Sequence, residues 1–348
     1  MTKEIKCENL DDAVLIDVRS PKEYSEAHIT NAINLPILTD EERAHVGYVY
    51  KNANPEEAKL LAVKYGSNKV SDIFQKFVSL YSNNKKIIFY CARGGMRSEV
   101  IASIIDSLGY KVYKLEGGFK AYRNFIVNSL PRVNEDVKYI VLHGKTGVGK
   151  TKLLNKLKHL NYDVLNLEEG ANHRGSILGS VGLGKSNSQK YFETYIYENL
   201  KNRKNNLVFV EDESKRVGNA FIPDSVANSM KNGYHILIEM PMEERIRILK
   251  DEYLGFENVN EEIKECILQL DRRLGKNFID KLSELLDKKN YDELAQILNE
   301  KYYDPLYEKS IKQYEFDLIL HVNSIEKALS DIIEFFNKIK EIKPGYIK

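Results

Sequence analysis

A cysteine stands in a short glycine-rich loop between a predicted strand and a predicted helix. Residues 86–90 are mainly apolar, as expected of a buried strand, and Cys91 follows them directly. Apolar residues then recur at helical spacing over 98–108. A thiol at such a turn faces a helix N-terminus, where exposed N–H groups and the helix dipole favour negative charge. Because the thiolate is the nucleophilic form of cysteine, this placement indicates nucleophilic chemistry at Cys91.

The residues around this cysteine strengthen that interpretation. Arg93 and Arg97 add fixed positive charge, which favours a thiolate and would hold an anionic substrate. Gly94 and Gly95 let backbone N–H groups converge on an oxyanion, and Ser98 completes the predicted oxyanion loop. We therefore predict that the cysteine and both arginines are catalytic. A buried structural cysteine is the alternative, but it would need no flanking arginines and glycines.

A second motif, G-x-x-x-x-G-K-T, occupies residues 144–151. It follows an apolar strand at 139–143 and precedes a predicted helix at 151–160, which is the context that a phosphate-binding loop (P-loop) requires. Backbone N–H groups would cradle a diphosphate, the lysine would neutralise it, and the threonine would hold Mg²⁺. The predicted diphosphate-binding residues are Gly144, Gly147, Gly149, Lys150 and Thr151.

A second predicted contact for this metal follows an apolar strand. Residues 207–210 lead into Glu211 and Asp212, and a carboxylate at the end of such a strand is the usual partner of a P-loop metal. We predict that Thr151 and one or both of these carboxylates contact Mg²⁺, and the sequence does not choose between the two. A solvated acidic turn is the alternative.

Two further loops carry cations that could contact an anionic substrate or RNA. His173 and Arg174 lie in a long glycine-rich segment, 168–184, and loops of this length are usually functional or mobile. Lys215 and Arg216 follow the acidic strand end. We predict all four as substrate contacts, with ordinary surface loops as the alternative.

The pattern of elements predicts two α/β domains. Short strands alternate with helices through residues 1–130, which is typical of a parallel sheet, and a polar stretch at 128–138 marks the predicted boundary. Residues 131–348 are predicted to form a P-loop NTPase-like α/β domain with a charged helical insertion at about 243–312. The cations of this insertion either contact RNA backbone or form a solvated face, and they are Arg245, Arg247, Lys250, Arg272, Arg273 and Lys276.

Composition excludes several classes of protein. The 348 residues have a formal net charge of +1, so the overall charge does not indicate nucleic-acid binding. A local basic face is still compatible with a nucleic-acid partner. Three cysteines, Cys7, Cys91 and Cys266, argue against a disulfide framework and for a reducing compartment. No signal-like segment or long apolar run occurs. We expect a cytoplasmic protein with no membrane partner and no haem, flavin or zinc.

Residues 15–36, LIDVRSPKEYSEAHITNAINLP, resemble the signature of rhodanese domains, and YCARGGMRS resembles their catalytic loop. The resemblance implies that Cys91 carries a persulfide or perselenide, and that Asp17 and Arg19 support the fold. Five residues separate Cys91 from Arg97, where common rhodaneses have four, and that wider spacing is also similar to cysteine-dependent phosphatases. Our hypothesis is that the wider loop suits a phosphate-bearing sulfur or selenium donor.

The pairing of a rhodanese-like domain with a P-loop domain resembles tRNA 2-selenouridine synthases. HRGS at 173–176, EDESKRVG at 211–218 and YDPLY at 303–307 carry the resemblance further. It implies that selenium from selenophosphate replaces the sulfur of 2-thiouridine at the tRNA wobble position, after S-alkylation by geranyl diphosphate. An enzyme that produces selenophosphate is then a possible partner. Two alternatives stay open: a sulfurtransferase coupled to a nucleotide-dependent kinase, and an RNA-binding switch module.

Overall fold

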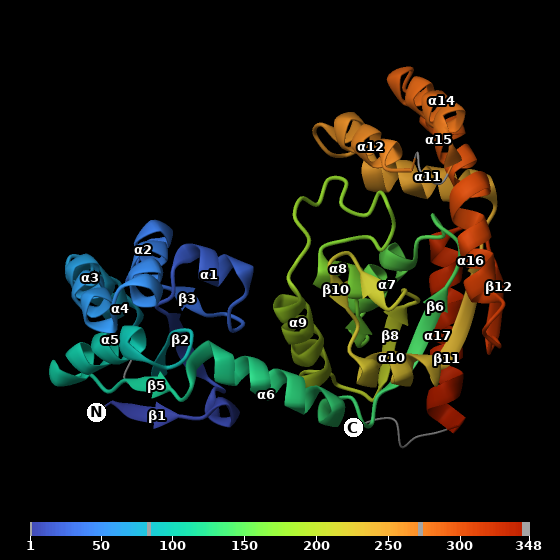
Figure 1. The fold of residues 1–348 in the computed structure, drawn as a ribbon. Coiled ribbons are helices and arrows are strands. Elements are labelled where there is room, and N and C mark those ends of the chain that lie inside the picture. Colours follow the sequence, from blue (N-terminus) through green and yellow to red (C-terminus); the bar gives the residue numbers. More distant parts are fainter. Residues whose placement is uncertain (1, 82–84, 271–273, 343–348) are drawn as a thin grey trace. The chain divides into compact units, whose positions relative to one another are not determined.

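The chain divides into two compact units, Met1–Ser129 and Leu130–Lys348. The computed structural model describes residues 2–81, 85–270 and 274–342. Each unit is built around a parallel five-stranded sheet with helices packed on it (Figure 1). This architecture confirms the predicted fold class of two α/β units.

The sheet of the first unit has the order β1-β5-β4-β2-β3, and all neighbouring strands are parallel. Its strands are β1 (Lys3–Ile5), β2 (Ala13–Asp17), β3 (Ile33–Asn34), β4 (Lys86–Tyr90) and β5 (Tyr113–Leu115). Four successive residues of β4, from Ile87 to Tyr90, are completely buried. A run of this kind shows that both faces of the strand are covered, as in other parallel sheets.

The helices of the first unit include one at Asp40–Asn52, which the sequence analysis did not predict, and a last helix that runs into the predicted boundary. They are η1 (Cys7–Asn9, 3₁₀), α1 (Pro21–Glu26), α2 (Asp40–Asn52), α3 (Pro55–Ser67), α4 (Val70–Leu80), α5 (Met96–Ser107) and α6 (Gly118–Val133). The predicted polar boundary at 128–138 is partly helical, because α6 continues to Val133 with Pro131 inside it. Pro131 has no N–H to donate to the Val127 carbonyl oxygen, so the last turn of this helix lacks one backbone hydrogen bond.

The sheet of the second unit has the order β12-β11-β6-β8-β7, again with parallel neighbours. Its strands are β6 (Lys138–His143), β7 (Val164–Leu165), β8 (Leu207–Glu211), β11 (Tyr234–Glu239) and β12 (Leu318–His321). A short antiparallel hairpin is formed by β9 (Arg216–Val217) and β10 (Ala220–Phe221). Because β6 is the central strand, the P-loop that follows it lies in the middle of the sheet's carboxyl edge.

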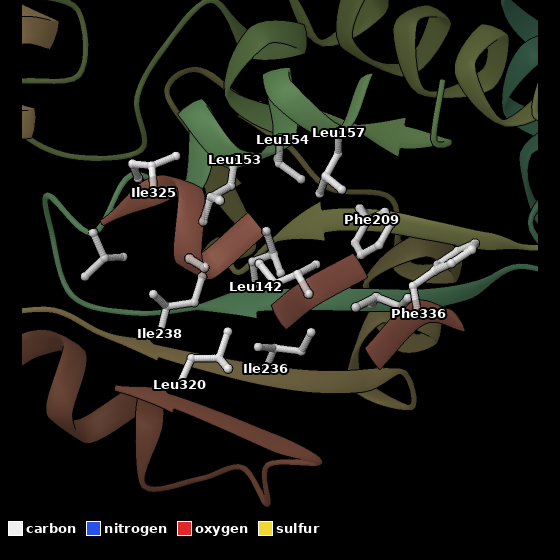
Figure 2. Packing of buried hydrophobic residues seen from close by; sticks show 14 of the residues in the cluster. Leu142, Leu153, Leu154, Leu157, Phe209, Ile236, Ile238, Leu320, Ile325 and Phe336 are labelled. Atoms are coloured by element: carbon white, nitrogen blue, oxygen red, sulfur yellow. The ribbon is translucent and has the colours of Figure 1, made fainter. Parts of the chain in front are cut away.

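Helices α7 (Lys150–His159) and α17 (Ile325–Ile342) supply side chains to the main core of this unit. Figure 2 shows Leu153 and Leu157 of α7 and Phe336 of α17 packed around Leu142 and Phe209 of the strands. The other helices near the sheet are α8 (Leu167–Ala171), α9 (Gln189–Lys201) and α10 (Asp224–Lys231).

The predicted helical insertion is present and has a core of its own. It contains α11 (Met242–Tyr253), α12 (Val259–Leu268), α14 (Lys276–Asp287), α15 (Tyr291–Leu298), the π-helix η2 (Asn299–Tyr303) and α16 (Asp304–Ile311). Ile267, Leu282 and Leu286 are buried in this core, together with Val181 from the loop before α9. Figure 1 shows α11, α12, α14 and α15 gathered at one end of the unit.

No helix within the described ranges combines the length and apolar character that a membrane span needs.

Candidate active sites

Cys91 lies at the carboxyl end of β4, directly before the loop that leads into α5. Its side chain is 3% exposed. The Ser98 hydroxyl donates a hydrogen bond to Cys91 Sγ at 3.3 Å, and Sγ lies 3.8 Å from the Gly95 carbonyl oxygen. No side chain caps the start of α5, so its first N–H groups remain available to an anion. The structure thus brings the predicted nucleophile and Ser98 together.

The Cys91 loop is held in shape by the turn between β5 and α6. Phe119 N donates to the Cys91 carbonyl oxygen at 2.8 Å. A Cβ atom on Gly118 would lie 2.3 Å from that same oxygen, and Gly118 has a φ of +59°. Only glycine allows so close an approach in this conformation. The sequence analysis did not select Gly118 as a residue of the site.

The two loop arginines are in different electrostatic surroundings. Arg97 donates from Nη1 and Nη2 to the carboxylate of Glu23, at 2.6 Å and 3.2 Å. Burial alone would raise the pKa of Glu23, but the hydrogen bonds and charge of Arg97 lower it, so this carboxylate is ionised at neutral pH. Arg93 is exposed and makes no ion pair within the described part of the chain. Arg93 is therefore the loop cation whose charge is not compensated.

Asp17 and Arg19 form a buried support beneath this loop, as the sequence predicts. Arg19 Nη2 donates to Asp17 at 2.6 Å and to the Ala27 carbonyl oxygen at 2.7 Å. The guanidinium lies 4.0 Å from the ring centroid of Phe119. Because both charged groups are almost completely buried and bonded to each other, this pair belongs to the interior of the unit and is not available for chemistry.

The P-loop connects β6 to α7 with the predicted residues in place. Lys150 Nζ donates to the Gly144 carbonyl oxygen at 2.9 Å and lies 5.2 Å from the ring centroid of Tyr307. Burial alone would lower the pKa of Lys150, but Tyr307 and neighbouring acidic groups raise it. The lysine is therefore a stable cation in the loop. Gly149 has a φ of +78°, and a Cβ there would lie 2.3 Å from Ile325 Cδ1.

The three predicted metal contacts do not all face one another. Thr151 Oγ1 donates to Glu168 Oε2 at 2.6 Å, and the Glu168 N–H donates to Glu211 Oε1 at 2.9 Å. Asp212 instead places Oδ2 3.1 Å from His143 Nδ1. Glu168, which the sequence analysis did not select, thus connects Thr151 with Glu211.

The carboxylates beside Thr151 fit a hard cation. Burial raises the pKa of Glu211 to about 8, and the Glu168 charge adds to the rise. Glu211 Oε2 is buried and has no hydrogen-bond partner among the described residues. In the described ranges no group of three or more His, Cys, Asp and Glu side chains is arranged to hold a metal unaided. Mg²⁺ commonly binds through one or two carboxylates and substrate phosphates, so these residues match its requirements.

A buried ion pair in the helical insertion holds the P-loop from outside. Arg245 of α11 donates from Nε to the Thr146 carbonyl oxygen at 2.8 Å. Its Nη1 and Nη2 donate to the two oxygens of Asp304 at 3.0 Å and 2.6 Å. Lys145 lies 3.7 Å from Asp304 and 2.8 Å from Glu308. These contacts give Asp304, within the YDPLY segment, a positioning role that the sequence did not reveal.

A cavity of about 810 Å³ opens beside the P-loop. Asp212 and Glu213 line it together with Tyr307, which stands over Lys150. Burial and the charges of Glu168 and Glu211 hold the pKa of Glu213 well above its usual range.

Two of the four predicted loop cations, Lys215 and Arg216, also line this cavity. Lys215 pairs with Asp224 at 2.6 Å, and Arg216 donates to the Gly218 carbonyl oxygen at 2.9 Å. Both side chains are exposed. They remain candidates for contact with an anionic substrate.

The other two predicted cations face the protein interior. Arg174 donates to the Val181 carbonyl oxygen at 2.7 Å and lies over the rings of Tyr253 and Phe256. His173 accepts from the Gly175 N–H at 3.1 Å, and burial and Arg174 lower the pKa of its ring. These contacts brace the 168–184 loop against α11.

Three insertion cations within the described ranges, Arg245, Arg247 and Lys250, are buried or paired and do not form one basic face. Arg245 is buried, Arg247 pairs with Glu244 at 2.6 Å, and Lys250 pairs with Asp292 at 2.7 Å. Arg272 and Arg273 lie outside the described residues.

Comparison with known proteins relates both units to characterised families. Residues 137–338 match the tRNA 2-selenouridine synthase AAA domain, and residues 2–125 match the rhodanese-like domain. The tRNA 2-selenouridine synthase of Nitrosomonas europaea is 36% identical over 248 residues, which cover 70% of this chain and 64% of that protein. The Nitrosomonas eutropha protein of the same name is 34% identical, with 70% and 63% covered.

The tRNA 2-selenouridine synthase of Sulfurovum sp. is 35% identical over 264 residues, which cover 74% of this chain and 70% of that protein. The match spans less than two-thirds of the length of the two Nitrosomonas proteins.

Proposed function

The chain belongs to the tRNA 2-selenouridine synthase family, and on that premise we propose that it modifies tRNA. The proposed reaction replaces the sulfur of 2-thiouridine at the wobble position by selenium. Geranyl diphosphate first alkylates the sulfur, and selenophosphate then supplies the selenium. The supporting observation is that one chain carries both a buried cysteine before an uncapped helix start and a P-loop beside a carboxylate cluster.

In the proposed first step, the diphosphate occupies the P-loop. Lys150 and the N–H groups at the start of α7 would bind its oxygens. Thr151, Glu168 and Glu211 would hold Mg²⁺. When bound, this metal supplies charge neutralisation for the departing diphosphate.

The alkylation balances without any oxidant or nucleotide hydrolysis. The thiocarbonyl sulfur attacks the first carbon of the geranyl group, a C–S bond forms, and the C–O bond to the diphosphate breaks. The N3 proton of the base is lost, so the product is a neutral S-alkyl base. Positive groups at the P-loop favour this step because negative charge develops on the leaving diphosphate.

In the proposed second step, the Cys91 loop takes part in selenium transfer. Arg93 and the uncapped N–H groups of α5 would bind the phosphate part of selenophosphate. The selenium of selenophosphate attacks C2 of the base, a C–Se bond forms, and the C–S bond breaks as geranylthiol leaves with a proton. Water then cleaves the P–Se bond, phosphate is released, and the proton returns to the base. The S-alkyl group makes this possible because a thiol leaves more readily than a thiocarbonyl sulfur.

Mass spectrometry of tRNA nucleosides separates the two steps. The full chain is incubated with 2-thiouridine tRNA, Mg²⁺ and geranyl diphosphate, and selenophosphate is added second. Lys150→Ala should abolish the S-geranyl product, whereas Cys91→Ala should accumulate it and form no selenouridine. The matched controls are Lys156→Ala, an exposed lysine of the same helix, and Cys7→Ala.

Geranylation by Lys150→Ala at the wild-type rate would reject the P-loop assignment. Full selenation by Cys91→Ala would reject the cysteine assignment. Hydrolysis of ATP stimulated by a small thiol acceptor, with no change in tRNA, would favour the coupled sulfurtransferase instead.

A further inference from the structure

Two arginines from different helices share one carboxylate beside the Cys91 loop. Arg97, in the first turn of α5, donates from Nη1 to Glu23 Oε2 at 2.6 Å. Arg43 of α2 places its Nε 3.7 Å from the same oxygen. The Ser20 N–H also donates to this oxygen, at 3.2 Å, as part of the capping box of α1. Glu23 therefore lies between two cations and is fixed by its own helix.

The sheet places this group of charges next to the cysteine. Asp17 of β2 pairs in register with Tyr90 of β4, so the chain leaves both strands at the same edge of the sheet. One exit leads into the Cys91 loop, and the other leads into α1, which carries Glu23. The charge of Glu23 therefore acts on any anion that the loop holds, both through Arg97 and through space.

The position of Arg43 depends on a glycine. A Cβ atom on Gly47, one turn further along α2, would lie 2.6 Å from Arg43 Nη1. A side chain there would push the guanidinium from its present place beside Glu23. Glycine is disfavoured inside a helix, so α2 gives up helix propensity at a position that leaves room for this arginine.

The charges around the loop do not cancel. Arg43, Arg97 and the exposed Arg93 contribute three positive charges, and Glu23 contributes one negative charge. The Glu23 and Arg97 side chains are only 25% and 19% exposed, so salt screens their interaction less than that of fully exposed charges. Without Arg43, Glu23 would have Arg97 as its one cationic partner and would compensate it fully.

We propose that Glu23 and Arg43 together set the positive charge that the Cys91 loop offers to an anionic donor. Glu23 weakens the attraction because it compensates Arg97. Arg43 competes for the same carboxylate, so Glu23 keeps a counter-charge when Arg97 turns toward the anion. Both are positioning residues, since they act through Arg97.

This balance has a consequence for turnover. The loop attracts a phosphate-bearing donor, yet it still releases the phosphate that the transfer leaves behind. This consequence rests on the proposed function, whereas the charge balance itself follows from the contacts of Glu23.

Protection of Cys91 from iodoacetamide by inorganic phosphate measures the charge of the loop. The full chain, with Cys7 and Cys266 replaced by serine, is labelled at constant ionic strength over a range of phosphate concentrations. The measured quantity is the phosphate concentration that halves the labelling rate. It reports anion binding and does not depend on how fast each variant is labelled without phosphate.

Glu23→Gln should lower this concentration about fivefold, because one negative charge near the anion is removed. Glutamine keeps an acceptor for Arg97 and can still form the capping box, so the fold of α1 is preserved. Arg43→Gln should raise the concentration about threefold, because Glu23 then compensates Arg97 alone.

The double variant tests whether Arg43 acts through Glu23. In the Glu23→Gln background Arg97 is already released, so adding Arg43→Gln should change the half-protecting concentration by less than about 1.5-fold. The matched controls are Glu57→Gln on α3 and Lys51→Gln at the other end of α2. They make the same charge changes at exposed positions and should leave the concentration unchanged.

Three results would overturn the proposal. The first is an unchanged or higher half-protecting concentration in Glu23→Gln, as expected if this carboxylate only holds Arg97 in place. The second is an undiminished effect of Arg43→Gln in the double variant. The third is a lack of protection by phosphate in every variant.

The failure of the proposed function would look different. The phosphate titrations need neither tRNA nor selenium, so they would follow the expected pattern while the wild-type protein formed no selenouridine.

Discussion

Replacing Asp304 by asparagine should destabilise the second unit and loosen its P-loop together. Asp304 is 9% exposed and Arg245 is 4% exposed, and two hydrogen bonds join them. The substitution leaves the Arg245 charge buried without a counter-charge. Removing one partner of a buried pair costs about 3–5 kcal/mol. Because asparagine can still accept one hydrogen bond, we expect a loss near the lower end, about 3 kcal/mol.

Urea unfolding followed by circular dichroism measures this loss. The two units should unfold in separate transitions, and only that of the second unit should move, by about 1–2 M urea. The first unit then serves as the internal control. An unchanged midpoint for the second unit would refute the reasoning, because the pair would then contribute no stability.

A double substitution separates stability from positioning. Arg245→Met with Asp304→Leu removes both charges, and an apolar replacement of a buried pair is often neutral or stabilising. Most of the lost stability should return. The Thr146 carbonyl oxygen, however, still lacks the Arg245 donor, so affinity for inorganic diphosphate should stay about tenfold weaker, or 1.4 kcal/mol. Full recovery of that affinity would show that Arg245 does not position the loop.

Two other predictions concern single side chains. Burial raises the pKa of Glu211 from 4.5 to about 8, so between these values the folded chain holds a proton that the unfolded chain has lost. With metal removed by EDTA, the free energy of unfolding of the second unit should therefore fall as pH rises from about 4.5 to 8. Urea titrations measure this fall, and Glu211→Gln should flatten it. An equally steep fall in the variant would contradict the assignment to Glu211. Ser98→Ala removes the hydroxyl that donates to Cys91, and such bonds to charged groups are worth about 1.5–3 kcal/mol. Iodoacetamide labelling of Cys91 at pH 7, with Cys7 and Cys266 replaced by serine, should slow about tenfold, whereas Ser107→Ala on the same helix should not change it.

Both candidate site loops could be located from the sequence because the residues that define each loop are contiguous. In each case a strand, a glycine-bearing loop and a helix start follow one another within about a dozen residues, and backbone geometry alone then places the side chains. The sequence accordingly located Cys91 beside Ser98 and Lys150 in the phosphate loop.

The contacts missed by sequence reasoning join residues that are far apart in the chain. Glu168 reaches Thr151 because β7 pairs with β8 and so brings the start of α8 to the end of β8. Asp304 and Arg245 are 59 residues apart, and only the packing of the insertion brings them together. Neither contact can be recognised from a local sequence pattern, because a charged residue on a helix is usually solvated.

The tight packing of Gly118 against Cys91 also affects the order of events during synthesis. The turn that shapes the cysteine loop is translated well after the cysteine. The strand before this turn, β5, pairs with β1, which lies at the start of the sequence of this unit. Domains generally fold as units as they leave the ribosome. On a growing chain, the loop around Cys91 can therefore take its final shape only when the first unit is nearly complete.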